Sequence, residues 1–343
     1  MRLLLVTDAW APQVNGVVVT LANTIACLGR FGRDVHVLSP AGMRTVPMPT
    51  YPEIPLAVLP GREVARRFRE VRPEAIHIAT EGPLGIAARG YCIANGLAFT
   101  TAYHTCFPEY VQPRFGIPLA WTYAWLRRFH RPSSAVLVGT DTIRTLLERR
   151  GFSRIADWSR GVDLELFHPR STRCREYPGP VFLFVGRIAV EKNLPAFLAL
   201  DLPGTKLVVG DGPERARLQR RYPEAVFVGM KTGAELVACY QRADVFVFPS
   251  RTDTFGLVLL EAMACGTPVA AFPVRGPIDV VKEPRAGILN EDLHEAAMTA
   301  LLLDRGEVRG YAERHSWERS TRQFASHLVP ALGGAVSRIP TPA

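Results

Sequence analysis

The chain has 343 residues, of which 48% are hydrophobic and 21% charged, a globular composition whose length suits two domains better than one. No apolar stretch approaches the roughly 18 residues that cross a bilayer, which argues against a membrane-spanning protein. The 41 Lys and Arg against 32 Asp and Glu give a formal net charge of +9. This balance suits a phosphorylated ligand, anionic lipid or nucleic acid, although an arginine-rich solvated surface is the simpler explanation of the charge.

The six cysteines form no C-x-x-C pair, and their spacing suggests neither a zinc site nor a disulfide framework. Free thiols in a reducing cytosol explain them best. The segment MRLLLVTDAW has a short apolar run before Asp8, too short for a signal sequence and typical of a first strand. We therefore expect a cytoplasmic protein that is soluble or peripheral at the inner membrane face.

Short apolar runs alternate with helical patterns through the first half of the chain. A strand at 3–7, a helix at 17–32 and a strand at 34–40 form a β-loop-α-β unit, which implies a parallel sheet. Further strands are predicted at 75–80, 98–105 and 135–140.

The same rhythm restarts in the second half, after a segment rich in Pro, Arg and Gly at 161–180. Strand, turn and helix follow one another through PGPVFLFVGRIAVEKNL (178–194). Four more strands are predicted, at 206–213, 225–230, 244–250 and 268–272, and the last helix is predicted at 317–328. The sequence therefore predicts two α/β halves, each with a parallel sheet.

In open α/β sheets, ligands bind at the carboxyl ends of the strands. The loop after the first strand, DAWAPQVNGVV, lacks a G-x-G-x-x-G fingerprint, but Gly16 precedes a helix where backbone N–H groups can meet an anion. An ordinary βα turn explains Gly16 as well. In GRIAVEKNL, Arg187 and Lys192 lie between a strand and a helix, where two cations suit a diphosphate, or are simply surface charges.

The stretch SRTDTFGLVLLEAMACGTPVA (250–270) combines two acids with an apolar run. A helix is predicted to begin at Phe255 or Gly256, and the amides of Phe255, Gly256 and Leu257 then form a second anion site. Asp253 precedes this helix, and Glu261 lies about one and a half turns into it, so both acids can reach one extended ligand. A solvated helix face is the alternative explanation for Glu261.

DTFGLVLLE resembles the acid–seven residues–Glu motif of the family 4 retaining glycosyltransferases. The resemblance extends in the family's order through DAWAPQVNGVV, AYHTCFPEY, SRGVDLELF, GRIAVEKN, VGDGP and GTPVAAF, roughly residues 3–325. It implies an α/β fold of the GT-B type, with two Rossmann-like domains whose parallel sheets face a central cleft. The implied acceptor domain is 1–168, the donor domain is 169–315, and a final helix at 316–330 packs back on the first domain.

The resemblance implies roles for the donor-site residues. Glu261 is expected to bind the ribose hydroxyls, and Asp253 to hold hydroxyls of the transferred sugar. Family members usually carry Glu at the position of Asp253, so this chain departs from the pattern by one methylene. The groups expected to grip the diphosphate are Arg187, Lys192 and the amides near Phe255, Gly256 and Leu257.

Other positions follow from the same resemblance. Gly16 is expected to approach the donor from the other domain, His104 to hydrogen-bond the reacting sugar, and the FVGM segment around Val228 to meet the base. No metal motif occurs, and a cationic clamp can replace a divalent ion, so neither metal nor cofactor is expected. The family retains anomeric configuration, and front-face attack is the expected route.

The acceptor is expected in the first domain, where Glu81 and Glu109 can bind its hydroxyls or be merely solvated. Two basic stretches, GREVARRFREVR (61–72) and PLAWTYAWLRRFHR (118–131), suit an anionic membrane surface. A packed helix with a solvated basic face is the simpler interpretation of both. The chain is most similar to the bacterial branch of α-mannosyltransferases and lipid glycosyltransferases, including sulfoquinovosyl-diacylglycerol synthases.

The resulting prediction is a hexosyltransferase that moves a hexose from GDP-mannose or a UDP-sugar to a hydroxyl of a glycan or glycolipid. A nucleotide-sugar epimerase, or another non-transferring enzyme of this fold, is the alternative. A nucleic-acid partner is not expected, because the chain has no zinc finger, RNP motif or helix-turn-helix.

Overall fold

The computed structural model describes residues 1–13, 15–48, 51–109, 112, 116–170 and 176–333. The chain divides into two compact units, one formed by Met1–Ser159 with the segment from Trp317 onward, the other by Arg160–Ser316. The division comes earlier than the predicted boundary at 168/169. Val162 explains the difference: it is buried in the core of the second unit, and its N–H donates to His315 O at 2.9 Å.

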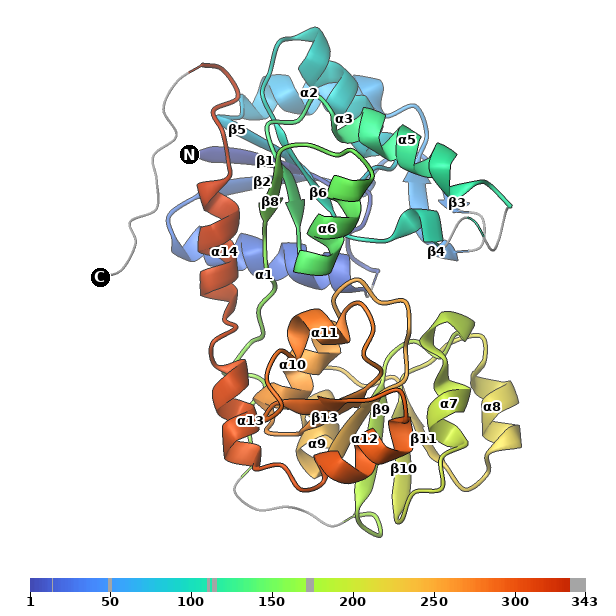
Figure 1. The fold of residues 1–343 in the computed structure, drawn as a ribbon. Coiled ribbons are helices and arrows are strands. Elements are labelled where there is room, and N and C mark those ends of the chain that lie inside the picture. The colour runs from blue at the N-terminus through green and yellow to red at the C-terminus, as the bar shows by residue number, and fades with distance from the viewer. Residues whose placement is uncertain (14, 49–50, 110–111, 113–115, 171–175, 334–343) are drawn as a thin grey trace. The chain divides into compact units, whose positions relative to one another are not determined.

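A six-stranded parallel sheet forms the centre of the first unit, in the order β2-β1-β5-β6-β7-β8 (Figure 1). Its strands are β1 (Arg2–Val6), β2 (Asp34–Leu38), β5 (Ala75–Ile78), β6 (Thr100–Tyr103), β7 (Val136–Val138) and β8 (Ile155–Asp157). A separate antiparallel hairpin consists of β3 (Thr45–Met48) and β4 (Tyr51–Ala57). The five predicted strands are present, and β8 and the hairpin are additions.

Helices cover both faces of this sheet because the residues of β1 alternate in direction. Leu3 and Leu5 pack toward α1 and α14, whereas Leu4 and Val6 pack toward α2, α3 and α5. The helices are α1 (Gly16–Arg30), α2 (Gly61–Val71), α3 (Pro83–Ala94), α5 (Leu119–His130), α6 (Asp141–Arg149) and α14 (Trp317–Ser326).

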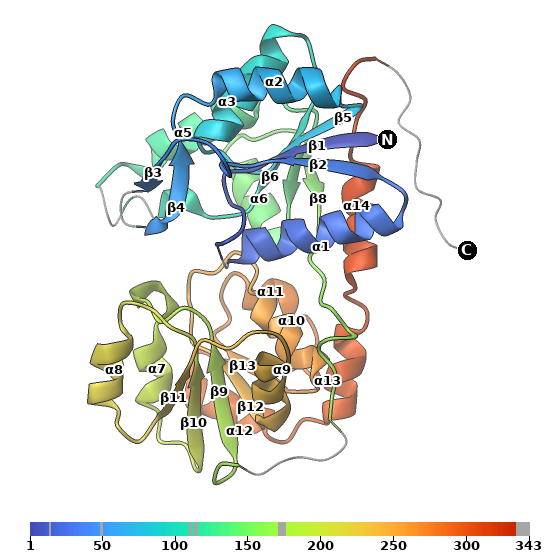
Figure 2. The same cartoon turned by 180° about the vertical axis from the view of Figure 1, so that it is seen from behind.

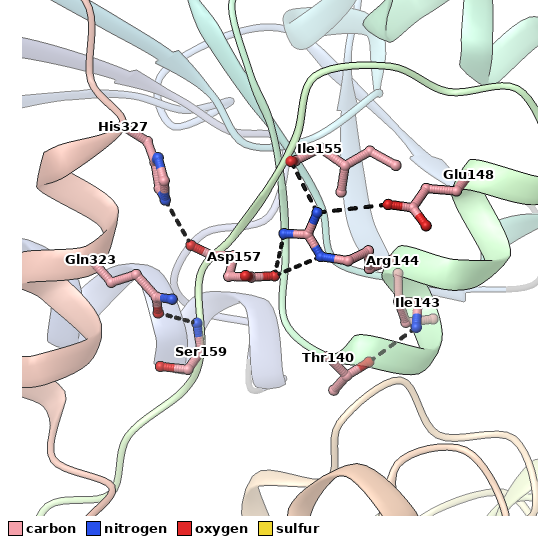
Figure 3. A network of polar contacts seen from close by, with 9 residues as sticks. All are labelled: Thr140, Ile143, Arg144, Glu148, Ile155, Asp157, Ser159, Gln323 and His327. Carbon is pink, nitrogen blue, oxygen red and sulfur yellow. Dashed lines mark hydrogen bonds and ion pairs between the residues drawn. The ribbon is translucent and has the colours of Figure 1, made fainter.

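Helix α14 is fastened to the end of β8 by side chains that bind backbone groups (Figure 3). His327 Nε2 lies 3.0 Å from Asp157 O, and Ser159 N donates to Gln323 Oε1 at 2.8 Å. From the other side, Arg144 donates to Asp157 Oδ1 and to Ile155 O, at 3.0 and 3.2 Å. The late helix therefore belongs to the first unit, as the sequence predicted.

The second unit is built around another six-stranded parallel sheet, in the order β11-β10-β9-β12-β13-β14 (Figure 2). Its strands are β9 (Val181–Val185), β10 (Thr205–Val209), β11 (Val226–Gly229), β12 (Val245–Phe248), β13 (Val269–Ala271) and β14 (Gly287–Leu289). The sequence predicted all of these strands except β14.

Alternating residues again supply two cores in this unit. Leu183 packs toward α9, α10 and α13, whereas Phe182 and Phe184 pack toward α7, α8 and α12. The helices are η1 (Val190–Lys192), α7 (Leu194–Leu198), α8 (Arg215–Arg221), α9 (Gly233–Arg242), α10 (Leu257–Ala264), α11 (Pro277–Val280), α12 (Leu293–Ala300) and α13 (Arg305–Ala312).

The described residues also bear on two expectations, one about membrane-spanning segments and one about the cysteines. No described helix is long and apolar enough to cross a membrane. Cys27, Cys92, Cys106, Cys239 and Cys265 are buried free thiols, as expected, and Cys174 lies outside the described residues.

Candidate active site

Strands β9 and β12 are neighbours in the second sheet, but the chain leaves them in opposite directions, toward β10 and toward β13. The loops that follow such a pair diverge and leave a crevice at their carboxyl ends, where ligands of open α/β sheets bind. The loop after β9 carries Arg187 and Lys192, and the loop after β12 carries Asp253. The predicted donor-site residues therefore lie at this switch point.

An ion pair joins the two loops. Lys192 Nζ donates to both carboxylate oxygens of Asp253, at 2.8 and 2.7 Å. The two side chains keep 24% and 17% of their surface exposed, so the pair is accessible to a ligand. Beside it, Asn193 has a left-handed backbone (φ 51°), and its Nδ2 donates to Pro249 O at 3.1 Å. These contacts hold a cation and an acid together at the mouth of the crevice.

Helix α10 begins one residue after the later of the two predicted starts, because Gly256 is the N-cap and Leu257 the first helical residue. Gly256 has φ +83°, and a Cβ there would lie 3.0 Å from a side-chain carbon of Leu259. Glycine therefore makes this tight turn possible. It also has no side chain to cap the helix, and the loop that holds Asp253 leads directly into this uncapped first turn.

A second glycine, which sequence reasoning did not single out, supports the same loop. Gly276 has φ +92°, and a Cβ there would lie 3.1 Å from Asp253 O and 3.4 Å from Phe255 O. The turn before α11 thus packs directly against the backbone that carries the acid. A glycine followed by Pro277 was the only available signal in the sequence.

Glu261 is the fifth residue of α10 and keeps part of its surface accessible. Its Oε2 accepts a 2.8 Å hydrogen bond from the hydroxyl of Tyr240, a fully buried residue of α9. Burial raises the pKa of Glu261 to about 7, and the Tyr240 hydrogen bond offsets only part of that effect. Glu261 therefore changes its protonation state near pH 7. Hydroxyl groups of a ligand that donate to it would favour its charged form.

Close backbone contacts fix the neighbouring loops of this edge. A Cβ on Gly210 would lie 1.9 Å from Gly186 O, and one on Gly212 would lie 2.4 Å from Ile188 O. Only glycine allows the loop after β10 to lie this close to the loop that holds Arg187. Val228, predicted to meet the base, is a half-buried residue of β11 at the end of the same sheet.

In the first unit, β1 and β5 form the corresponding switch point. Gly16 is the first residue of α1, as expected for a βα turn. Asn15 precedes it, and its Oδ1 accepts from the N–H groups of Val17 and Val18, each at 3.0 Å. Two of the amides near Gly16 therefore already have a partner.

Asp8 also lies at this switch point, although it was not predicted as a site residue. Its carboxylate accepts from the N–H groups of Leu84 and Gly85 at 2.9 and 3.2 Å, and from the Thr80 hydroxyl at 2.9 Å. Burial raises the pKa of Asp8 in spite of these hydrogen bonds. Asp8 thus accepts hydrogen bonds from the first backbone N–H groups of α3, which is a structural role.

The two predicted acceptor acids both have protein partners. Glu81 Oε1 lies 3.2 Å from Nε2 of the buried His130, and the Tyr123 hydroxyl donates to Glu109 Oε1 at 2.7 Å. Residues 110, 111 and 113–115 of the predicted acceptor loop lie outside the described residues.

His104 follows β6 and is half-buried. Its ring meets the ring of Trp158 edge-on, with centroids 5.3 Å apart and an angle of 71°. Trp158 is fully buried, and Phe324 of α14 packs on it at 4.7 Å. The position of His104 therefore depends on an aromatic stack that includes the late helix.

Two family models match the chain, one in each unit. The model described as Glycosyltransferase Family 4 matches residues 14–166, and the model described as Glycosyl transferases group 1 matches residues 179–304. The chain is also similar to a GDP-mannose-dependent alpha-mannosyltransferase of Mycobacterium tuberculosis, with 33% identity over 319 residues, 84% of this chain and 83% of the relative.

A plant protein shows a likeness of the same order. Sulfoquinovosyl transferase SQD2 of Arabidopsis thaliana is 32% identical over 328 residues, which cover 84% of this chain and 63% of that protein. Among solved structures, the sucrose-phosphate synthase of Thermosynechococcus elongatus has the same fold, with a TM-score of 0.75 at 19% identity over 95% of this chain and 97% of that one. The chain therefore belongs to glycosyltransferase family 4 and is a GT-B glycosyltransferase that transfers a sugar from a nucleotide sugar.

Proposed function

We propose that the protein is a retaining hexosyltransferase that uses GDP-mannose, with a UDP-hexose as the other candidate donor, and a hydroxyl of a glycan or glycolipid as acceptor. The GDP-mannose-dependent activity of the mycobacterial relative supports this donor. Its product is alpha-linked, and the mannose of GDP-mannose is also alpha-linked. Such a reaction requires net retention.

The observation that carries the proposal is the ion pair of Lys192 and Asp253 at the β9/β12 switch point, next to the N-terminus of α10. A diphosphate placed at these amides would be neutralised by Lys192 and Arg187. Asp253 would then accept from hydroxyls of the transferred sugar, and Glu261 from hydroxyls of the ribose. Before the donor binds, the ion pair would hold the Lys192 side chain in the position from which it contacts the diphosphate.

In the proposed reaction, the bond between the anomeric carbon and the phosphate oxygen breaks, and the acceptor oxygen bonds to the same face of the sugar. The leaving phosphate takes the acceptor's proton. His104 would hydrogen-bond the sugar from the first unit. Cationic side chains and helix amides can stabilise the charge on the leaving diphosphate, so we propose that no metal ion or other cofactor is required.

A lipid-linked acceptor at a membrane surface is supported by α5. Trp121 and Trp125 on this helix are 73% and 43% exposed, and tryptophan favours the interface between water and lipid. Helix α2 contributes less free charge than its sequence suggested, because Arg66 is paired with both Glu63 and Glu70. Helix α2 therefore supports a membrane surface less strongly than α5 does.

The decisive experiment is a donor screen by thermal shift and by turnover with GDP-, UDP- and ADP-sugars, with and without EDTA. The anomeric configuration of the product is then read by NMR. Stabilisation and consumption of one donor, unaffected by EDTA, with an alpha product, is the expected result. If no nucleotide sugar stabilises the protein or is consumed, the proposal is wrong.

Two variants test the assigned donor contacts. Glu261→Ala and Lys192→Ala remove a hydroxyl acceptor and a phosphate cation, so each is expected to weaken donor binding by about tenfold or more. Glu283→Ala and Arg314→Ala serve as controls, because they break an exposed ion pair of 2.7 Å in the same unit. Unchanged donor affinity in both site variants would contradict the assignment.

A further inference from the structure

The first unit contains a cavity of about 400 Å³ that no step of the transfer reaction uses. One wall is the carboxyl-terminal part of α5, with Arg127, Arg128, His130 and Arg131. The opposite wall is formed by residues 151–153, which precede β8, and by Val136 at the start of β7. The cavity therefore lies at the amino-terminal edge of these parallel strands, whereas ligands of open α/β sheets generally bind at the carboxyl ends.

The wall is strongly cationic. Three arginines line the cavity, and its described lining contains no carboxylate. Arg150 and Arg154 lie close by: Arg127 donates to Arg150 O at 2.9 Å, and Arg154 donates to Arg131 O. Among the described residues, none of these five arginines forms an ion pair. His130 of the wall has an acidic partner, Glu81, at 3.2 Å.

This concentration of charge extends to a neighbouring arginine. Arg89 donates to Phe129 O and Arg128 O, at 2.8 and 2.9 Å. Burial lowers the pKa of Arg89, and the charge of Arg128 lowers it further. The partial negative charge at the end of α5 attracts cations, but it amounts to about half a unit charge and falls off within one turn. It does not balance three guanidinium groups.

The local backbone leaves room for these side chains. Gly151 has φ +77°, and a Cβ there would lie 3.3 Å from Nη1 of Arg127. Ser153 adds an exposed hydroxyl, and the buried ring of Phe152 adds an apolar surface. Guanidinium groups bind phosphate oxygens through paired hydrogen bonds. The volume is near the lower end of the range for small-ligand sites, roughly 300–1,000 Å³.

We propose that this arginine cavity is a second ligand site, which binds the phosphate group of a phosphate ester. Two sources share that chemistry: a soluble phosphorylated compound and the headgroup of an anionic phospholipid. The exposed Trp121 and Trp125 lie earlier on the same helix and suit the second source. The proposal does not depend on the identity of the sugar donor, because the cavity and the donor-binding residues belong to different units.

The test measures phosphate binding in the absence of nucleotide sugar. Calorimetry with inorganic phosphate and glycerol 3-phosphate probes the soluble source, and flotation with vesicles of phosphatidylglycerol in phosphatidylcholine, against phosphatidylcholine alone, probes the lipid source. The double variant Arg128→Gln/Arg131→Gln is expected to lower the affinity by about tenfold or more. Arg62→Gln/Arg69→Gln removes the same charge from exposed positions of α2 and is the matched control.

Saturable binding of either probe that is lost in the cavity variant and kept in the control supports the site, and the probe that binds identifies the source. Absence of binding to every probe overturns it, as does an equal loss in both double variants. Ser153→Glu provides an independent check, because an acid at this exposed position neutralises the cavity without removing an arginine. Retention of binding in a folded Ser153→Glu protein also contradicts the proposal.

Discussion

The hydroxyl of Tyr240 is predicted to set the pH at which the protein binds its donor. This hydroxyl donates to Glu261 at 2.8 Å from a fully buried position, while burial keeps the pKa of Glu261 at about 7. Tyr240→Phe removes the hydrogen bond and leaves the ring in place. The charged form of Glu261 then loses a stabilising partner, and its pKa rises.

The size of the shift follows from the energy of that bond. A hydrogen bond to a charged group contributes about 1.5–3 kcal/mol, and one pKa unit corresponds to about 1.4 kcal/mol. The pKa of Glu261 should therefore rise by roughly one to two units. If ionised Glu261 accepts from ribose hydroxyls, donor affinity increases with pH, with a midpoint near pH 7 in the parent protein and about 8–9 in the variant.

The assay is calorimetric titration of the donor at a series of pH values, with Tyr222→Phe as the control. Tyr222 is a half-buried tyrosine of the same unit that follows α8, away from Glu261. The reasoning is refuted if Tyr240→Phe binds with the parent's pH midpoint. A loss of affinity that is uniform at every pH refutes it as well, because it would indicate damage to packing instead of a shifted titration.

Three further predictions follow from the structure. Because burial raises the pKa of Glu261, its carboxyl group binds a proton more tightly in the folded protein than in the unfolded chain. The free energy of unfolding should therefore fall by up to about 3 kcal/mol between pH 4.5 and 7. In urea titrations, Glu261→Gln should abolish this pH-dependent part of the stability. Gly276→Ala should destabilise the protein by about 1–2 kcal/mol and weaken donor binding, because the added Cβ would meet Asp253 O and the residue has a positive φ. Thermal unfolding measures the loss of stability, and calorimetry measures donor binding. Gly90→Ala is the control, because no atom lies within 4 Å of a Cβ added there. Trp158→Phe should lower kcat with little change in donor Kd, because His104 loses its edge-on support; a kcat equal to the parent's would contradict this role.

The strands were predictable because buried parallel strands are continuous apolar runs between breakers. The strands that sequence reasoning missed are of two kinds. β8 (IAD) and β14 (GIL) lack the longer apolar run that surrounds the equally short β7 and β13 in the sequence. β3 and β4 contain Pro47, Pro52 and Pro55, which argue against a strand unless it is a two-stranded hairpin outside the main sheets.

Within the candidate site, the chain positions of the acids and cations were readable, but their partners were not. Glu261 could be identified as an acid in an apolar run, while Tyr240 is 21 residues earlier on another helix. In the same way, His130 binds Glu81 across 49 residues. Such contacts depend on how helices pack on a sheet, which local patterns do not encode. The sequence alone shows that Asp253 replaces the Glu that is usual in the family. Its ion pair with Lys192 is seen only in the structure, because it depends on how the two loops lie.

The return of α14 to the first unit has a consequence for biosynthesis. The second unit is one uninterrupted run of chain, whereas the first is interrupted by it and lacks Phe324 until synthesis has continued past that residue. Until then, the face of Trp158 that Phe324 covers stays exposed to water. The second unit can therefore complete its core before the first, although the first is synthesised earlier. A released chain that is truncated before Trp317 should contain a folded second unit and, on the first unit, an apolar surface that chaperones recognise.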